Sequence, residues 1–257
     1  MDNLNFIKLK QMALKAAERI GKPSFYNDYK SEVKISSELL KTNIHLKKCR
    51  SYLDESLMGV GHGLAHSEAV AVDTGAVIQA ESRLYDLNNK LVEELIIYAQ
   101  IAGLLHDIRR KEKDHTIRGS NEAKKILEGF HIGSHYKGYI ATAIRNHEAF
   151  KEVPESENKI AKLISGALYD ADKFRWGPDN FTTTVWLILD HGDIPIDMVC
   201  NNFTENIKYI EKIKETFRTE TGKKYGPEFI DIGVMIGNVI YEEMTGILKN
   251  KDEKLKS

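Results

Sequence analysis

IAGLLHDIRR, residues 101–110, is the stretch around which this 257-residue chain is organised. An apolar run rich in small residues ends abruptly at His106 and Asp107, and two arginines follow. Neighbouring positions on a helix point about 100° apart, so adjacent ligands converge on one ion only at a helix end or a distorted turn. A buried His–Asp pair without such a partner leaves a charge desolvated, which is unfavourable. The stretch therefore predicts a buried helix that ends at a polar site.

Helical spacing of apolar residues dominates the rest of the chain, and alternating strand patterns are scarce. Helices are expected over residues 4–20, 25–57 (one or two), 66–84, 90–105, 115–129, 134–149, 157–176 and 181–189. The segment 90–105 is apolar nearly all round, which predicts a central, buried helix. Two more helices should follow, one with a stripe from Phe203 to Phe217 and one that begins near Gly226-Pro227, since proline suits a first turn. The fold class predicted is all-α.

The composition limits the kinds of partner and compartment. Charged residues make up 29% of the chain and the net charge is −1, so neither nucleic acid nor an anionic membrane is expected as a partner. Cys49 and Cys200 lie far apart, which argues against a disulfide framework and a thiolate zinc site. Because we find no signal-peptide pattern and no apolar run of about 18 residues, we expect a cytoplasmic protein without a membrane segment.

Polar residues gather where the expected helices end. The candidates are His62, His66, His106, Asp107, His115, His147, Asp170 and Asp172. Imidazole and carboxylate suit zinc, manganese, iron or, with more oxygen ligands, magnesium. Since the candidates come from different expected helices, we expect a metal site inside a helical bundle. Asp170 and Asp172 face nearly opposite sides of a helix, so both cannot bind one ion directly.

The order of these residues resembles the HD-domain superfamily of metal-dependent phosphohydrolases, whose pattern is H…HD…D on an all-α fold. Three stretches are similar to its motifs, namely residues 66–71 (HSEAVA), 102–108 (AGLLHDI) and 169–174 (YDADKF). The resemblance covers about residues 60–180. It implies a single-domain helical bundle with an HD core at 58–180, an N-terminal helical extension at 1–57 and C-terminal helices at 181–257 that pack on the core.

The resemblance also implies the ligands of a divalent ion, which are His66, His106, Asp107 and Asp172. Mn, Fe, Zn, Mg, Co and Ni are all compatible with such a set. His62 is the alternative first ligand, although a pocket or supporting role is favoured for it.

Two further histidines, His115 and His147, resemble those of binuclear members, so one ion and two ions both stay open. Asp170 is expected either to orient a histidine or to cap local backbone. The chain lacks the double histidine and the GYP signature of the family's cyclic-di-GMP phosphodiesterases.

Basic residues near the motifs are candidates for phosphate binding, because guanidinium and ammonium groups donate to phosphate oxygens. Arg110 and Lys173 are favoured, and Glu148 or His115 is the candidate acid or base. Of all the basic candidates, which also include Arg109, Lys111, Arg145 and Arg175, two or three are expected to reach a pocket. Trp176 and Phe181 could form an aromatic wall, although helix-end packing is favoured for them.

The function implied by the resemblance is hydrolysis of a phosphate ester in a nucleotide or related phosphorylated small molecule. Two alternatives stay open, a di-iron HD-type oxygenase and a catalytically silent, nucleotide-sensing HD domain. The helical extensions make a homo-oligomer possible.

Overall fold

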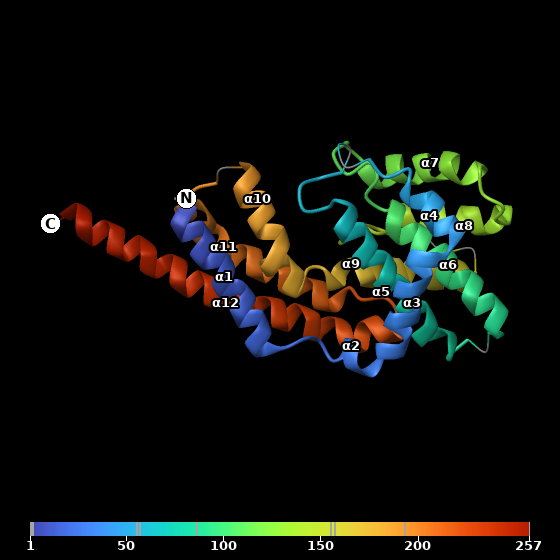
Figure 1. The fold of residues 1–257 in the computed structure, drawn as a ribbon, viewed down its shortest axis with the longest axis horizontal. Helices are drawn as coiled ribbons and strands as arrows, with labels where there is room; N and C mark the ends of the chain where they lie inside the picture. The colour runs from blue at the N-terminus through green and yellow to red at the C-terminus, as the bar shows by residue number, and fades with distance from the viewer. Residues whose placement is uncertain are drawn as a thin grey trace.

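The computed structural model describes residues 3–54, 56, 58–85, 87–154, 156, 158–192 and 194–256, without the side chains of 3, 4 and 250–256. Every regular element in these residues is a helix, which confirms the all-α prediction (Figure 1). Leu57 and Ser257, where the two extensions were predicted to end, lie outside the described residues.

The elements follow the helical spacing of the sequence closely. They are α1 (Asn3–Ile20), α2 (Phe25–Asp28), α3 (Lys30–Thr42), α4 (Ile44–Arg50), α5 (Leu64–Ser82), α6 (Asn89–Leu105), α7 (His115–Glu128), α8 (Ser134–Arg145), α9 (Lys159–Phe174), the π-helix η1 (Asn180–Thr184), α10 (Val185–Gly192), α11 (Ile196–Glu211), the 3-10 helix η2 (Lys212–Glu215) and α12 (Glu220–Lys256). The segment 25–57 holds three helices rather than one or two. Asn43 separates the last two of them, because its extended backbone ends α3 and its side chain caps α4 by accepting from His45 N at 2.9 Å.

The core is centred on α5 and α6. Helix α5 packs against α6, α3 and α9, and the end of α6 is buried from Ala99 onward, as predicted for a central helix. Gly103 is required at the crossing of α5 and α6, since an added Cβ would lie 2.6 Å from Cα of Ala71. This close approach brings the start of α5 beside the end of α6, where the histidines lie.

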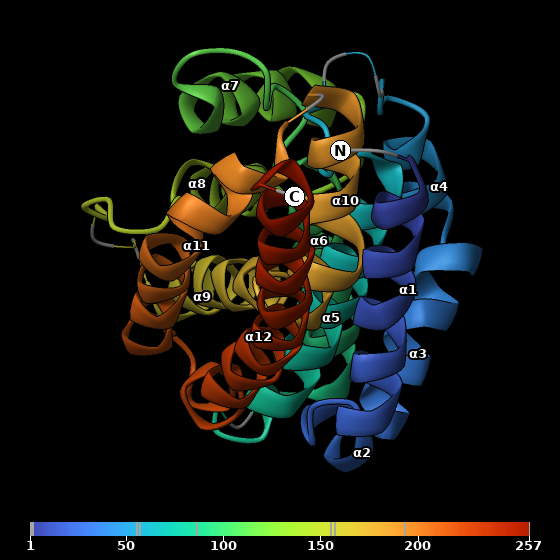
Figure 2. The same ribbon diagram turned by 90° about the vertical axis from the view of Figure 1, so that its left-hand side faces the viewer.

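The C-terminal helices form a second layer beside this core. Helix α12 runs along α1 and α11, and Figure 2 shows it between these two helices. In Figure 1 the end of α12 extends beyond the rest of the molecule. None of the described helices combines the length and apolar character needed to cross a membrane.

The predicted start of the last helix near Gly226-Pro227 is wrong, because α12 begins at Glu220. Thr219 caps it, since Oγ1 of Thr219 accepts a hydrogen bond from the N–H of Gly222 at 2.8 Å. Pro227 therefore lies inside the helix instead of opening it.

Candidate metal centre

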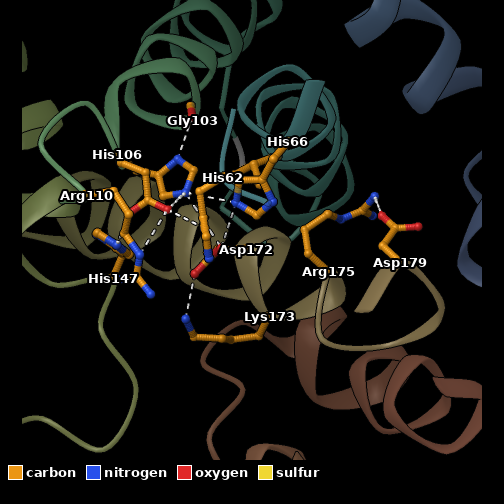
Figure 3. Close-up of polar contacts among 12 residues, drawn as sticks. His62, His66, Gly103, His106, Arg110, His147, Asp172, Lys173, Arg175 and Asp179 are labelled. Atoms are coloured by element: carbon orange, nitrogen blue, oxygen red, sulfur yellow. Dashed lines mark hydrogen bonds and ion pairs between the residues drawn. The ribbon is translucent and has the colours of Figure 1, made fainter. Parts of the chain in front are cut away.

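The candidate ligands come from four places in the fold and meet in one space. His66 lies in the first turn of α5, His106 directly follows α6, His147 follows α8 and Asp172 lies near the end of α9. Figure 3 shows these side chains pointing toward one another. The resemblance therefore named residues that the fold does bring together.

One group of donors consists of His66, His106 and Asp172. The Nε2 atoms of His66 and His106 lie 3.3 Å apart. Oδ1 of Asp172 lies 3.4 Å from Nε2 of His66 and 3.7 Å from Nε2 of His106. Such spacing lets three ligand atoms share one ion.

Asp107 lies at the centre of a second group of donors. Its Oδ2 is 2.7 Å from Nδ1 of His62 and 3.4 Å from Nε2 of His106. Its Oδ1 is 3.3 Å from Nε2 of His147. The two carboxylate oxygens thus face different imidazoles, which fits either one shared ion or two neighbouring ions.

In two of the histidines, a hydrogen bond to the backbone determines which ring nitrogen remains available to bind a metal. Nδ1 of His106 donates to the carbonyl of Gly103 at 2.7 Å, and Nδ1 of His147 donates to the carbonyl of Ile144 at 2.6 Å. In the neutral rings, Nε2 therefore carries a lone pair. A contact of this kind behind a ligand histidine is typical of metal sites.

The donor set fits a cation for an electrostatic reason. Oδ1 of Asp107 is buried and accepts no hydrogen bond from any residue that the structure describes. It faces the lone pair of His147 at 3.3 Å. Two acceptors at this distance repel each other unless a proton or a metal ion lies between them.

The ionisation of the carboxylates matches that requirement. Burial alone raises the pKa of Asp107, but the charge of His106 and hydrogen bonds from the surrounding histidines hold it well below its ordinary value. Burial likewise raises the pKa of Asp172, but the charge of Lys173, a hydrogen bond from His66 and the charges of His106 and His147 together outweigh it. This pKa is therefore also well below the ordinary range.

The pKa values of the two facing histidines shift in opposite directions. Burial lowers the pKa of His66. Burial also lowers the pKa of His106, but the charges of Asp107 and Asp172 outweigh it and leave a raised pKa.

The structure places His62 and His115 differently with respect to the cluster. His62, for which a pocket or supporting role was favoured, lines the cavity beside the cluster and lies within donor distance of both His66 and Asp107. Nε2 of His115 lies 3.8 Å from Asp107 and accepts a hydrogen bond from Nη1 of Arg110 at 2.7 Å. Burial and the charge of Arg110 lower the pKa of His115 to about 4. The structure thus places His62 inside the cluster and His115 at its edge.

Asp170 faces away from the cluster, as expected for a residue two positions from Asp172. It accepts hydrogen bonds from the backbone N–H groups of Arg218 and Thr219, both at 2.8 Å, and from the hydroxyl of Thr219 at 2.7 Å. It therefore binds the backbone just before α12, 48 and 49 residues away, rather than a histidine or the local backbone as expected.

A cavity of about 490 Å³ opens beside the cluster. Three of the six basic candidates line it, Arg110, Lys173 and Arg175, which agrees with the number predicted. Nζ of Lys173 is buried and lies 2.5 Å from Oδ2 of Asp172. Arg175 is bound by Asp73 and by Asp179, the latter as Figure 3 shows, whereas Arg110 and Lys173 contact members of the cluster, His115 and Asp172.

The other predicted basic residues lie outside the cavity lining described. Arg109 pairs with Glu112 and Glu122, each at 3.2 Å. Lys111 donates to the carbonyl of Ser56 at 2.8 Å, and Arg145 is exposed.

Glu148, the candidate acid or base, does line the cavity, and it lies 3.8 Å from Lys151. Trp176 and Phe181 line it as well, so both belong to an aromatic wall. Phe181 is also buried at the helix ends, against Gly237 of α12.

The sequence reasoning missed the opposite wall of the cavity, which α10, α11 and α12 supply. Its members are Trp186, Leu189, Phe203, Ile240 and Met244. Their helical spacing was the available signal, but the same spacing describes ordinary core contacts.

Chemically, the arrangement offers imidazole and carboxylate donors for a divalent ion, two cationic groups next to them and a cavity large enough for a small molecule. No family model matches the chain, and neither a curated protein nor a solved structure matches it.

Proposed function

We propose that the protein is a metal-dependent phosphohydrolase that cleaves a phosphate ester of a small molecule. One observation carries the proposal, namely the convergence of His66, His106, Asp107 and Asp172 from separate helices within 3.3–3.7 Å contacts. These are the residues that the resemblance to the HD-domain superfamily identifies as ligands. A cavity for the substrate adjoins them.

The donor set favours some metals over others. His66, His106, Asp107 and Asp172 would hold one ion, and His62 or His147 offers further nitrogen donors beside Asp107. A set rich in imidazole suits Zn, Mn, Fe, Co or Ni better than Mg, which prefers oxygen ligands. An ion held there supplies Lewis acidity, which polarises a phosphoryl group and lowers the pKa of water at the site.

The chain's own groups have three tasks in this proposal. Lys173 and Arg110 bind the phosphoryl oxygens and offset the charge that develops on them. As the bond from phosphorus to the ester oxygen breaks and one to a water oxygen forms, the departing oxygen needs a proton. Glu148, on the cavity wall, is our candidate to deliver it.

The test uses the purified full-length protein, reconstituted in turn with each divalent metal. Bound metal is measured by mass spectrometry, and hydrolysis is measured with p-nitrophenyl phosphate and bis-p-nitrophenyl phosphate. The His106→Ala/Asp107→Ala double variant should lose both metal and activity. His131→Ala, which changes an exposed histidine, serves as the control and should keep both.

Each other outcome has a definite meaning. Hydrolysis that survives the double substitution contradicts the proposal. Iron-dependent oxygen consumption without hydrolysis supports the di-iron oxygenase instead. If the protein binds no metal and hydrolyses none of a broad panel of phosphate esters, the result supports the catalytically silent, nucleotide-sensing domain.

The phosphate-binding role has its own matched pair of variants. Arg110→Gln should lower kcat/KM by about 10- to 1000-fold, since removal of one charge-stabilising donor has effects of this order. Arg109→Gln changes the neighbouring arginine, which pairs with Glu112 and Glu122 away from the cavity. Equal effects of the two substitutions would exclude a specific role for Arg110.

A further inference from the structure

The cavity has two chemically different ends. One end is the metal centre with its cationic neighbours. The other end, which we name the apolar arm, is lined by Phe181, Trp186, Leu189, Phe203, Ile240 and Met244. All six side chains are at most 9% exposed, so the arm is an interior surface and not part of the outer face.

The apolar arm offers few polar partners to a ligand. The indole N–H of Trp186 is not free, because it donates to the carbonyl of Phe181 at 2.7 Å. Among the described lining residues on this side, the polar ones are Asn180, Thr184, Asn206 and Tyr209. Asn206 and Tyr209 are exposed, whereas Asn180 and Thr184 are half-buried. Arg175 and Trp176 also line the cavity, and Nε of Arg175 is buried without a hydrogen-bond partner among the described residues.

This polarity discriminates between two classes of phosphate ester. A nucleoside placed in the arm would bury ribose hydroxyls and base edges with too few partners, and each unpaired polar group is costly. A hydrocarbon chain has no polar groups to satisfy, and its burial is favourable. The lining therefore favours an apolar alcohol over a nucleoside.

The residues of the apolar arm and those of the metal centre line the same cavity. Thr184, at the end of the π-helix η1, packs against Gly61, where an added Cβ would lie 2.8 Å from Cγ2 of Thr184. Gly61 has a φ of 79°, which favours glycine, and it directly precedes His62. π-Helices are rare and often lie at functional sites.

We infer that the substrate is a phosphate ester of an apolar alcohol, with its hydrocarbon chain in the apolar arm and its phosphate at the metal centre. This inference rests on the proposed hydrolase function. It replaces the nucleotide, which the sequence suggested as the substrate, with a phosphate ester of an apolar alcohol. The volume of about 490 Å³ lies in the range of small-molecule sites.

Binding can be measured without turnover, because both tryptophans of the chain, Trp176 and Trp186, line the cavity. Their fluorescence is titrated with methyl-, butyl- and decylphosphonate, which carry a P–C bond that a phosphoesterase does not cleave. Concentrations stay below micelle formation. We expect the affinity to rise about two- to fourfold per methylene until the arm is filled. Affinity that does not depend on chain length, or AMP binding more tightly than decylphosphonate, overturns the inference.

Two pairs of variants test the location. Val199→Phe and Ile188→Lys change residues that line the cavity, while Met198→Phe and Leu187→Lys change their described neighbours outside that lining. Ile188 and Leu187 are 41% and 44% exposed, so Ile188→Lys and Leu187→Lys introduce a charge at positions of similar solvent exposure. The lining variants should weaken decylphosphonate at least tenfold and leave methylphosphonate unchanged. Equal effects of the two substitutions within a pair would show that the hydrocarbon chain does not bind in the apolar arm.

Hydrolysis of decyl and methyl phosphate separates this inference from the proposed function. Faster cleavage of decyl phosphate, with chain-dependent phosphonate binding, supports both. Hydrolysis with no preference for chain length overturns the inference and leaves the hydrolase function standing. Chain-dependent binding without hydrolysis of any ester supports the apolar occupant and contradicts the hydrolase function.

Discussion

Asp107 and Asp170 are both buried carboxylates, but their surroundings differ in kind. Asp170 meets only hydrogen-bond donors, the N–H groups of Arg218 and Thr219 and the hydroxyl of Thr219. Asp107 meets imidazole nitrogens, and one of its oxygens accepts no hydrogen bond from the described residues. The donors around Asp170 are supplied as the chain folds, whereas the group around Asp107 could hold a cation. A buried carboxylate thus reveals its role by what its oxygens face.

Asp107→Asn should have the largest effect, because it removes the charge that balances the ion. We expect bound metal to fall to background and hydrolysis to fall at least 1000-fold, or about 4 kcal/mol in transition-state stabilisation. The free energy of unfolding of the metal-free protein should also fall, since the neutral amide loses the interaction with His106 that holds the pKa of Asp107 well below its ordinary value. Metal analysis, kinetics and urea unfolding measure the three effects. Asp170→Asn should keep its metal, and loss of metal there would break the comparison.

Removal of the metal should have the next largest effect, and only where Asp107 is intact. A ligand present at 100 times its Kd stabilises the folded state by about 2.7 kcal/mol, which corresponds to a fall in Tm of roughly 5–10 °C on chelation for a chain of this size. Asp107→Asn should show no such change. A wild-type Tm that changes neither with chelator nor with added metal would contradict a metal centre.

The comparison also explains what the sequence could and could not predict. Helix positions follow from apolar spacing, which is local, and so 90–105 was recognised as a helix. Its predicted burial holds from Ala99 onward, while Lys90 and Glu93 are exposed. The start of α12 was missed because its capping group Thr219 is held by Asp170, 49 residues earlier in the chain. Pro227 is a strong local signal, and it pointed to the wrong residue because a long-range contact decides the helix start.

The candidate metal centre was predictable to a similar extent. The position of polar residues at helix ends gave a longer list of candidates, and the resemblance to the HD-domain superfamily selected His66, His106, Asp107 and Asp172 from it. The place of His62 depends on the turn at Gly61, which no spacing rule gives. The apolar arm could not be predicted from the sequence, because a stripe of apolar residues has the same helical spacing whether it packs against another helix or lines a cavity.

Asp170→Asn should destabilise the fold without affecting the metal. The amide keeps one acceptor oxygen, but its N–H₂ group then faces either the N–H of Arg218 or the N–H and hydroxyl of Thr219. Buried donors without partners cost about 1–3 kcal/mol. Urea unfolding of the metal-free variant and wild type measures the loss. An unchanged free energy of unfolding would mean that the contacts of Asp170 do not hold α12 to α9.

Thr219→Ala should have the smallest effect, about 1 kcal/mol, because it removes the helix cap while Asp170 keeps two backbone donors. Thr204→Ala, at an exposed position of α11, is the control and should change little. The free energy of unfolding lost by Asp170→Asn should exceed that lost by Thr219→Ala, since the carboxylate serves both backbone donors and the threonine. If the alanine variant loses as much as the asparagine variant, the hydroxyl and not the carboxylate fixes the start of α12. Asp170 would then be a buried charge of unknown purpose beside the metal centre, and the contrast with Asp107 would no longer hold.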